Sequence, residues 1–389
     1  MLTWLRHAEV YAPAPLGRRD LLIGGGQILA IGAALGPPRG VPCEEVDLDG
    51  ARVIPGLIDA HVHATGGGGE AGPHTRVPPI ALTALSTAGV TSCVGVLGTD
   101  TTTRTMRSLV ARTLGLRAEG LAAWCWTGGY QIPPCTLTGA VRDDIVFVDP
   151  IIGAGETAIS DHRSAQPTLD ELLRLAADCH VAGLHTGKAG VLHLHVGDGA
   201  RGLDLVRRAL DGSELPARVF HPTHANRQPR LLDEAMALAR RGVTIDVTAF
   251  PPDDDDPAVP AAAAIEAWLD AGLPPGQLTC SSDGAGCLPV FDASGQVARM
   301  DVGRPATLAD TLAHLVRRRE LAAVLPVFTR NVAALLRLPG KGELVAGADA
   351  DVVVLGADDR PRDVLARGRW LVRGGAPILR GPFEPAAPR

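Results

Sequence analysis

Two histidines separated by one residue, His61 and His63, are the first groups in the chain whose types and spacing could do chemistry. They follow the apolar run 53–60, whose β-branched residues predict a strand buried on both faces. Residues i and i+2 of a strand point to the same side, so both imidazoles leave the strand end in one direction. Neutral imidazole is the commonest metal ligand. We therefore expect a metal site here, the alternative being a purely structural pair.

Further imidazoles and carboxylates follow other predicted strands and could complete this site. They are Glu156, His195, His224 and Asp283. Barrel enzymes keep their sites at the C-terminal ends of parallel strands, where such groups would meet. Four imidazoles and two carboxylates suit two divalent ions, most simply Zn2+. Two such ions about 3.5–4 Å apart can hold a bridging hydroxide and polarise a carbonyl, which predicts hydrolysis of an amide or related acyl bond.

Some of these assignments have competitors in the sequence. His193 shares a strand face with His195, and His221 lies three residues before His224. We favour His195 and His224 because each lies nearer the end of its strand. Asp283 could instead cap a helix, since Asp is a favoured N-cap residue. Its position in a Ser-Ser-Asp-Gly segment after an apolar strand favours a catalytic role.

The elements that must position these groups alternate between strand and helix. We expect strands at 91–97, 191–196, 219–222 and 242–247, and helices at 168–180, 203–210, 229–241 and 261–271. This alternation predicts an α/β fold, a (β/α)8 TIM-like barrel over residues 55–339, with an open doubly wound sheet as the alternative. The acidic run 252–257 is interpreted as a solvated loop without chemistry.

Both ends of the chain have a different character from the middle. Residues 20–23 and 27–31 flank a glycine-rich turn, and residues 350–355 and 368–372 are also typical of strands. We expect residues 1–54 and 340–389 to form one small β-sandwich domain built from both termini.

Composition excludes several classes of partner. The net charge of −6 offers no basic field for nucleic acid or anionic lipid, and aromatic residues make up only 3% of the chain. No apolar run is long enough to span a bilayer, and the first seven residues lack the apolar stretch of a signal peptide. Seven cysteines without CxxC pairs fit reduced thiols. We expect a cytoplasmic protein with no membrane or nucleic-acid partner.

The ordered set of His61, His63, a carboxylate, His195, His224 and Asp283 resembles the amidohydrolase superfamily. Segment 346–352, in the return strand of the terminal domain, fits the same superfamily. Segments 66–73, 97–100, 159–164 and 222–227 narrow the resemblance to the isoaspartyl (β-aspartyl) dipeptidase family. The resemblance implies a binuclear metal-dependent dipeptidase that hydrolyses the β-linked amide of isoaspartyl dipeptides, and a homo-oligomer.

The resemblance also implies residue roles. Asp283 would act as general base and then general acid, and Tyr130 would polarise the scissile carbonyl. The α-ammonium of the substrate would meet Glu70, assisted by Gly68 and Thr99. Its carboxylates would meet Arg163 and Arg227, and arginine suits bidentate carboxylate binding. The bland alternatives are a surface salt bridge for each arginine and simple packing for the tyrosine.

The sequence departs from the family pattern at two positions. Glu156 stands where the family has a carboxylated lysine that bridges the metals, and Lys188 is too distant in the chain to replace it. We expect no carboxylated lysine, and a strand bulge made by an extra residue at Gly155 to bring the shorter Glu156 to the ions. Cys287 stands where the family has a substrate-contacting serine, and a thiol is a weaker hydrogen-bonding group.

Two rival functions stay open at this point. One is another amidohydrolase, hydantoinase-like or acting on N-acyl amino acids, which would need fewer ionic contacts than Glu70, Arg163 and Arg227 offer. The other is a non-catalytic binding paralogue, against which the presence of Asp283 argues.

Overall fold

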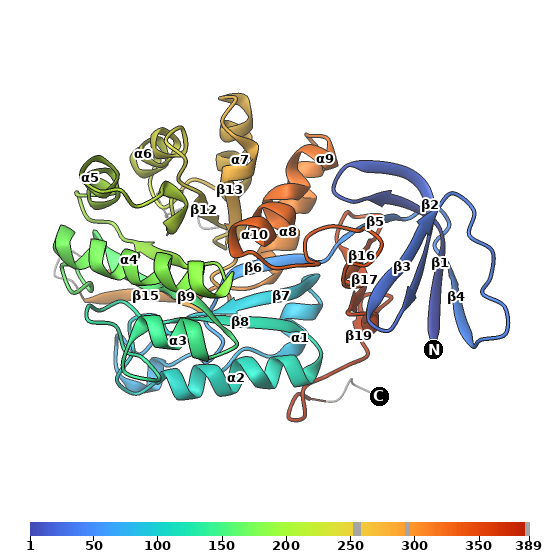
Figure 1. The fold of residues 1–389 in the computed structure, drawn as a ribbon, viewed down its shortest axis with the longest axis horizontal. Helices are drawn as coiled ribbons and strands as arrows, with labels where there is room; N and C mark the ends of the chain where they lie inside the picture. Colours follow the sequence, from blue (N-terminus) through green and yellow to red (C-terminus); the bar gives the residue numbers. More distant parts are fainter. Residues whose placement is uncertain (252–257, 292–295, 386–389) are drawn as a thin grey trace.

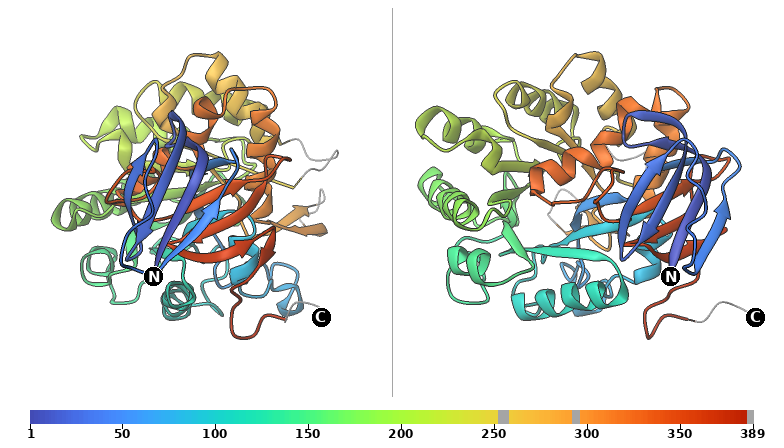
Figure 2. Two further views of the ribbon diagram at one scale, coloured as in Figure 1. Left: turned by 90° about the vertical axis from the view of Figure 1, so that its right-hand side faces the viewer. Right: turned by 45° about the vertical axis from the view of Figure 1, so that its right-hand side comes forward.

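Strands from both ends of the chain share one sheet in the computed structural model, which describes residues 1–251, 258–291 and 296–385. Its order is β19-β18-β17-β16-β5-β1-β2-β3, with β4 paired to β1. The strands are β1 Leu2–Tyr11, β2 Pro15–Gly24, β3 Gln27–Gly32, β4 Cys43–Asp47, β5 Arg52–Pro55, β16 Val352–Leu355, β17 Pro361–Ala366, β18 Arg369–Arg373 and β19 Ala376–Pro377. Figure 2 shows the N-terminal and C-terminal strands side by side. The expected hairpin between β2 and β3 is confirmed.

The middle of the chain alternates between parallel strands and helices, as predicted. Six parallel strands pair in chain order from β6 to β11, and β12 and β13 form a parallel pair. Their bounds are β6 Leu57–Val62, β7 Val90–Gly95, β8 Ala122–Thr127, β9 Ile151–Ile159, β10 Val191–Val196, β11 Phe220–Thr223, β12 Ile245–Thr248 and β13 Leu278–Ser281. A parallel bridge between Val62 and Gly284 brings the chain just after β13 beside the end of β6.

Helices flank these strands on the outside (Figure 1). They are α1 Leu82–Ser86, α2 Met106–Glu119, α3 Val141–Phe147, α4 Leu169–Thr186, α5 Asp204–Gly212, α6 Pro229–Ala239, α7 Ala261–Asp270, α8 Ala306–Val316, α9 Leu321–Val324 and α10 Arg330–Leu336. In the described part of the chain, no helix combines the length and apolarity needed to cross a bilayer.

Helix α4 illustrates how local sequence sets the boundaries of these elements. Thr168 accepts from the backbone N–H of Glu171, whose carboxylate accepts in turn from the Thr168 N–H, a capping box at the helix start. The helix ends at Thr186, and the next residue, Gly187, has a φ of 74°, a left-handed conformation that suits glycine. It is therefore longer than the predicted 168–180, because its amphipathic pattern continues to Thr186.

The prediction of a single strand over 53–60 is wrong. The chain passes from one sheet to another at Gly56, since Val53 pairs with Val354 of β16 while Leu57 pairs with Val90 of β7. A side chain at Gly56 would lie 2.1 Å from the Thr91 hydroxyl. Both sheets are buried at this point, so the residues on either side of Gly56 are apolar, and their periodicity does not reveal the crossing.

An antiparallel ribbon after β13, made of β14 Cys287–Phe291 and β15 Val297–Val302, was not predicted. The acidic run 252–257 lies outside the described residues, so its interpretation as a loop is not tested.

Candidate metal centre

The predicted imidazoles and carboxylates meet in one buried cluster, which we call the metal-type cluster, towards the C-terminal ends of β6, β9, β10, β11 and β13. Its members are His61, His63, Glu156, His195, His224 and Asp283. Three overlapping groups have ligand atoms within 4.8 Å of one another: His61 with His63 and Glu156, His61 with His224 and Asp283, and Glu156 with His195 and His224. The competing His193 and His221 belong to none of these groups among the described residues. The structure therefore gathers the six predicted ligands, and it separates His195 and His224 from their competitors.

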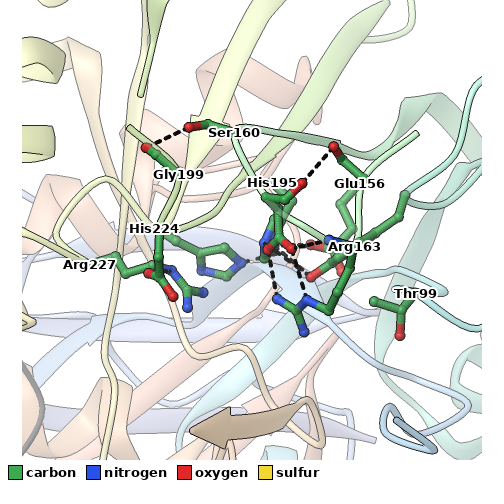
Figure 3. Close-up of polar contacts among 12 residues, drawn as sticks. Thr99, Glu156, Ser160, Arg163, His195, Gly199, His224 and Arg227 are labelled. Atoms are coloured by element: carbon green, nitrogen blue, oxygen red, sulfur yellow. Dashed lines mark hydrogen bonds and ion pairs between the residues drawn. The ribbon is translucent and has the colours of Figure 1, made fainter. Parts of the chain in front are cut away.

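Glu156 lies at the centre of the cluster. Its Oε1 lies 3.4 Å from His63 Nε2, and its Oε2 lies 3.5 Å from His61 Nε2 and 3.3 Å from His195 Nδ1. His224 Nε2 is 3.8 Å from the same Oε2. The carboxylate thus faces all four imidazoles, as a group shared by two ions must. Glu156, His195 and His224 appear in the close-up with Arg163 and Arg227 (Figure 3).

The bulge predicted in the strand that carries Glu156 is present. Leu192 of β10 pairs with Ala154 and Leu194 pairs with Thr157, so β9 has one residue more than β10 between these pairs. Gly155 has a φ of 151°, and a side chain there would lie 2.6 Å from the carbonyl oxygen of His193. Only glycine meets both conditions without a clash. A bulge re-aims the side chain beside it, here the carboxylate of Glu156.

Opposite charges dominate the electrostatics of the cluster. Burial by itself lowers the pKa of His61, but the adjacent Glu156 and Asp283 carboxylates outweigh it and raise this pKa well above its usual value. Burial likewise opposes ionisation of Glu156, yet the imidazoles of His61, His195 and His224 hold its pKa well below the usual range. Asp283 behaves in the same way, because His61 and His63 lower its pKa. Both carboxylates are therefore charged and require positive charge beside them.

The donor set fits divalent metal ions. His61 Nε2, both carboxylate oxygens of Glu156 and Asp283 Oδ1 are buried, and none has a hydrogen-bond partner among the described residues. The opposite ring nitrogens of three histidines are held: His61 Nδ1 by His193, His195 Nε2 by Asp161, and His224 Nδ1 by Thr248, at 2.8–2.9 Å. Metal-binding histidines are oriented in this way by a partner on the other nitrogen. The residues present thus suit two ions of the zinc type.

Strained backbone accompanies the site. Ser160, His224 and Asp283 follow the ends of β9, β11 and β13 with φ values of 52°, 62° and 53°. Non-glycine residues with positive φ are uncommon, and they gather at active sites where the surroundings hold them in place.

Substrate-side groups surround a cavity of about 350 Å3 above the cluster. Every predicted substrate-binding residue lines it: Gly68, Glu70, Thr99, Arg163, Arg227 and Cys287. Other lining residues are Tyr130, Asp198 and Phe250, and Leu288, Pro289 and Val290 of β14. The Thr99 hydroxyl donates to Glu70 Oε1 at 2.9 Å, and Glu70 Oε2 is buried with no hydrogen-bond partner in the described residues. The cavity thus pairs an anionic acceptor with cationic groups beside the metal-type cluster.

Arg163 has a role that sequence reasoning did not anticipate. It holds the Asp161 carboxylate, with Nη2 at 2.8 Å from Oδ2, and that carboxylate in turn contacts His195 Nε2 at 2.9 Å. Its Nη1 lies 3.6 Å from Glu70 Oε1. Asp161 was missed as a site residue, although its position at the end of a strand with a carboxylate ligand was a usable signal.

A second missed residue, Arg104, holds the glycine-rich loop at residues 66–69, which follows β6. Its guanidinium donates to the carbonyl oxygens of Gly67 at 2.7 Å and Gly68 at 3.1 Å, and its side chain is only 3% exposed. The loop carries Gly68 and leads to Glu70, so Arg104 shapes the cavity without lining it. A lone arginine shortly before a helix, here α2, gives no sequence signal of this kind.

The surroundings of Tyr130, Cys287 and Lys188 are also defined. The Tyr130 hydroxyl lies 2.8 Å from His195 Nδ1, and burial, followed by the Glu156 charge, raises the pKa of this phenol well above its usual value. Burial raises the pKa of the Cys287 thiol to about 11. Lys188, by contrast, donates to the carbonyl oxygens of Ile145, Val148 and Ile151, away from the cluster.

Parallel strands with four imidazoles and two carboxylates at their ends define a protein of the amidohydrolase type. The chain is 38% identical to the β-aspartyl dipeptidase of Fervidobacterium islandicum AW-1, solved in complex with a β-Asp-Leu dipeptide, with a TM-score of 0.93. The alignment covers 97% of each chain. The chain therefore belongs to the β-aspartyl dipeptidase family, which confirms the resemblance seen in the sequence.

More distant matches agree with this placement in fold. The dihydropyrimidinase of Brevibacillus agri NCHU1002 has a TM-score of 0.65 at 18% identity, over 98% of this chain and 97% of that one. A dihydroorotase of Leifsonia xyli is 36% identical over 120 residues, which span only 27% of this chain and 27% of that protein. No protein-family model matches the chain. The likeness to the dihydropyrimidinase supports the fold alone.

Proposed function

We propose that this protein is a binuclear metal-dependent dipeptidase that hydrolyses the β-linked amide of isoaspartyl dipeptides. The observation that carries the proposal is the meeting of Glu70, Arg163 and Arg227 with the metal-type cluster in one cavity. Such a substrate has an ammonium group and two carboxylates around its amide. Among the groups that line the cavity, Glu70 offers an anionic acceptor and Arg163 and Arg227 offer guanidinium groups, which complement that pattern.

Metal ions, most simply Zn2+, would supply Lewis-acid polarisation of the scissile carbonyl and lower the pKa of water. His61, His63, Glu156 and Asp283 would hold one ion, and Glu156, His195 and His224 the other. No carboxylated lysine is needed, because Glu156 supplies the shared carboxylate. This assignment rests on the distances of the cluster and on its unpartnered buried atoms.

Asp283 is the group that moves the proton. Its Oδ1 lies 3.0 Å from His63 Nε2, and the adjacent imidazoles keep its carboxylate ionised. An ionised carboxylate can accept a proton from water, hold it on the Asp283 oxygen, and deliver it to the departing amine. The Tyr130 phenol stays protonated because its pKa is raised, so it can donate a hydrogen bond to the carbonyl oxygen as negative charge develops there.

Glu70 Oε2 would accept from the α-ammonium of the substrate, with Thr99 and the loop at Gly68 fixing its position. Arg163 and Arg227 would hold the carboxylates, and Cys287 would lie beside the bound dipeptide. A dipeptide that lacks the free ammonium would leave Glu70 buried and unpaired, which is costly. This selection distinguishes the proposal from hydantoinase-like or N-acyl amino acid hydrolysis.

The surrounding architecture is part of the proposal. We propose that β6–β13 close into a (β/α)8 barrel, and that residues 55–339 and residues 1–54 with 340–389 are separate domains, the second a small β-sandwich. We also propose a cytoplasmic homo-oligomer without nucleic-acid or membrane partners, consistent with the net charge of −6.

The test is an assay of purified protein of measured metal content. β-Asp-Leu should be cleaved. N-acetyl-β-Asp-Leu lacks the ammonium, and α-Asp-Leu carries the same charges at other positions relative to the scissile amide; both should be cleaved at least about 100-fold more slowly, because one lost or misplaced charged contact costs about 3 kcal/mol. Equal rates for the α-linked and β-linked peptides would refute the substrate assignment. Activity only towards hydantoins or N-acyl amino acids would favour the first rival. Inert, zinc-loaded protein would favour a binding paralogue.

A further inference from the structure

A series of buried hydrogen bonds runs from the metal-type cluster to the carboxylate of Asp246 in β12. His61 Nδ1 lies 2.8 Å from His193 Nε2, and His193 Nδ1 lies 2.9 Å from His221 Nδ1. His221 Nε2 lies 3.0 Å from the Thr279 hydroxyl, which lies 2.7 Å from Asp246 Oδ1. All five side chains are fully buried.

The groups at the two ends of this series of hydrogen bonds require every hydrogen bond in it to be donated in the same direction. His61 Nε2 faces the carboxylates of the cluster and must offer a lone pair to a metal, so its proton is on Nδ1 and is donated to His193. Asp246 also accepts from the hydroxyls of Thr223 and Ser281, which leaves it the acceptor for Thr279.

Between these ends, each neutral imidazole has one donor and one acceptor. His193 accepts at Nε2 and therefore donates from Nδ1 to His221. His221 in turn donates from Nε2 to Thr279. Both rings are fully buried and their ring nitrogens contact other imidazoles and a hydroxyl, not a carboxylate, which favours the neutral form of each. The ring of His193 is also held in place by stacking on Trp126, with centroids 5.2 Å apart and planes at 14°.

We propose that His193, His221 and Thr279 form a relay that fixes the tautomer of His61, so that Nε2 is always the nitrogen offered to the metal. The inference rests on the metal centre put forward under the proposed function. These residues touch neither substrate nor metal, so they are positioning residues. The relay extends the usual arrangement, in which a carboxylate contacts a metal-binding histidine directly, through three intervening side chains.

Thr279 provides the sharpest test because it is three hydrogen bonds away from His61. Thr279→Val removes the acceptor of the His221 proton, whereas Thr279→Ser keeps it. His193→Phe keeps a ring on Trp126 but breaks the relay beside His61. Trp126→Phe is the packing control: it alters the stack and removes the indole hydrogen bond to the Ala60 carbonyl oxygen, but it leaves the hydrogen bonds of the relay in place. Two independent substitutions keep the test open if one variant fails to fold.

The measurements are Zn2+ affinity by chelator competition, the visible absorption spectrum of the Co2+-loaded protein, and urea unfolding of each metal-free variant. We expect Thr279→Val and His193→Phe to bind Zn2+ about 10–100-fold more weakly and to show altered Co2+ spectra. Thr279→Ser and Trp126→Phe should keep the affinity and spectrum of the wild type. Wild-type affinity and spectrum in Thr279→Val or in His193→Phe would overturn the relay, as would an equal loss in Trp126→Phe. Wild-type protein that binds neither ion would overturn the metal centre itself, and the relay with it.

Discussion

Replacing Glu156 by glutamine would test the proposal that a genetically encoded carboxylate unites the two halves of the metal centre. The change keeps the shape of the side chain and removes its charge. In the structure this charge lies within 3.3–3.8 Å of a nitrogen on each of four histidines. An ion held by any of these histidines would therefore lie close to the carboxylate.

The magnitude follows from Coulomb's law. A carboxylate and a unit positive charge about 4 Å apart attract each other by about 4 kcal/mol at an effective dielectric constant of about 20. Loss of this attraction lowers the affinity for each ion about a thousandfold. The glutamine side chain still offers one oxygen as a ligand atom, so binding is weakened without being abolished. Because both ions share Glu156, the variant should lose affinity at both sites together.

The assay is metal content after dialysis against a chelator series, read by plasma mass spectrometry, with β-Asp-Leu hydrolysis measured in parallel. Glu70→Gln is the matched control: the same substitution in the same cavity should raise KM and leave the metal content unchanged. Two tightly bound ions and full activity in Glu156→Gln would refute the bridging role. Selective loss of one ion would show that Glu156 belongs to a single site.

Three further outcomes are expected. Asp283→Asn should lower kcat for β-Asp-Leu by about 10^2–10^4-fold, the usual contribution of a general acid–base group, and an unchanged pH–rate profile would count against this role. Arg104→Met should raise KM about tenfold or more at unchanged metal content, because the Gly67 and Gly68 carbonyls lose their donor; unchanged KM would show that the loop holds itself. The folded-state pKa of His221, lowered to about 3 by burial, lies below its unfolded value, so its stabilising contribution is present above about pH 6.5 and lost as the pH falls. Between about pH 7 and pH 5, the unfolding free energy of metal-free His221→Gln should therefore fall by about 2 kcal/mol less than that of the metal-free wild type. Urea titration at each pH measures this difference, and parallel pH curves for the two proteins would contradict it.

The sequence predicted the elements that have strong local signals. Helix α4 was expected from its amphipathic pattern, and β10 from its run of apolar and histidine residues. The crossing at Gly56 was not predicted because both of the sheets that it joins bury their strands. The ribbon of β14 and β15 was missed since its residues are partly exposed and lack a clear alternation.

The metal-type cluster was predictable because its members are chemically distinctive and lie in or just after strands. The partners behind them were not. Arg104 acts through backbone carbonyls, which no residue pattern reveals. His193 was weighed only as a competitor of His195: spacing places both on one face of β10, and depth along the strand favoured His195 without giving His193 a role of its own. In the structure that depth separates a histidine of the cluster from the residue that orients His61.

The bulge in β9 and the histidine relay occupy the same place in the sheet. His193 of β10 lies between the residues paired with Ala154 and Thr157, and therefore opposite the extra residue that directs Glu156 to the cluster. A side chain at Gly155 would collide with the His193 backbone, so neither feature tolerates a larger residue there.

A carboxylate encoded in the gene, such as that of Glu156, needs no reaction with CO2 to carry its charge. Wild-type activity should therefore be independent of bicarbonate, and a requirement for it would mean that another group bridges the ions.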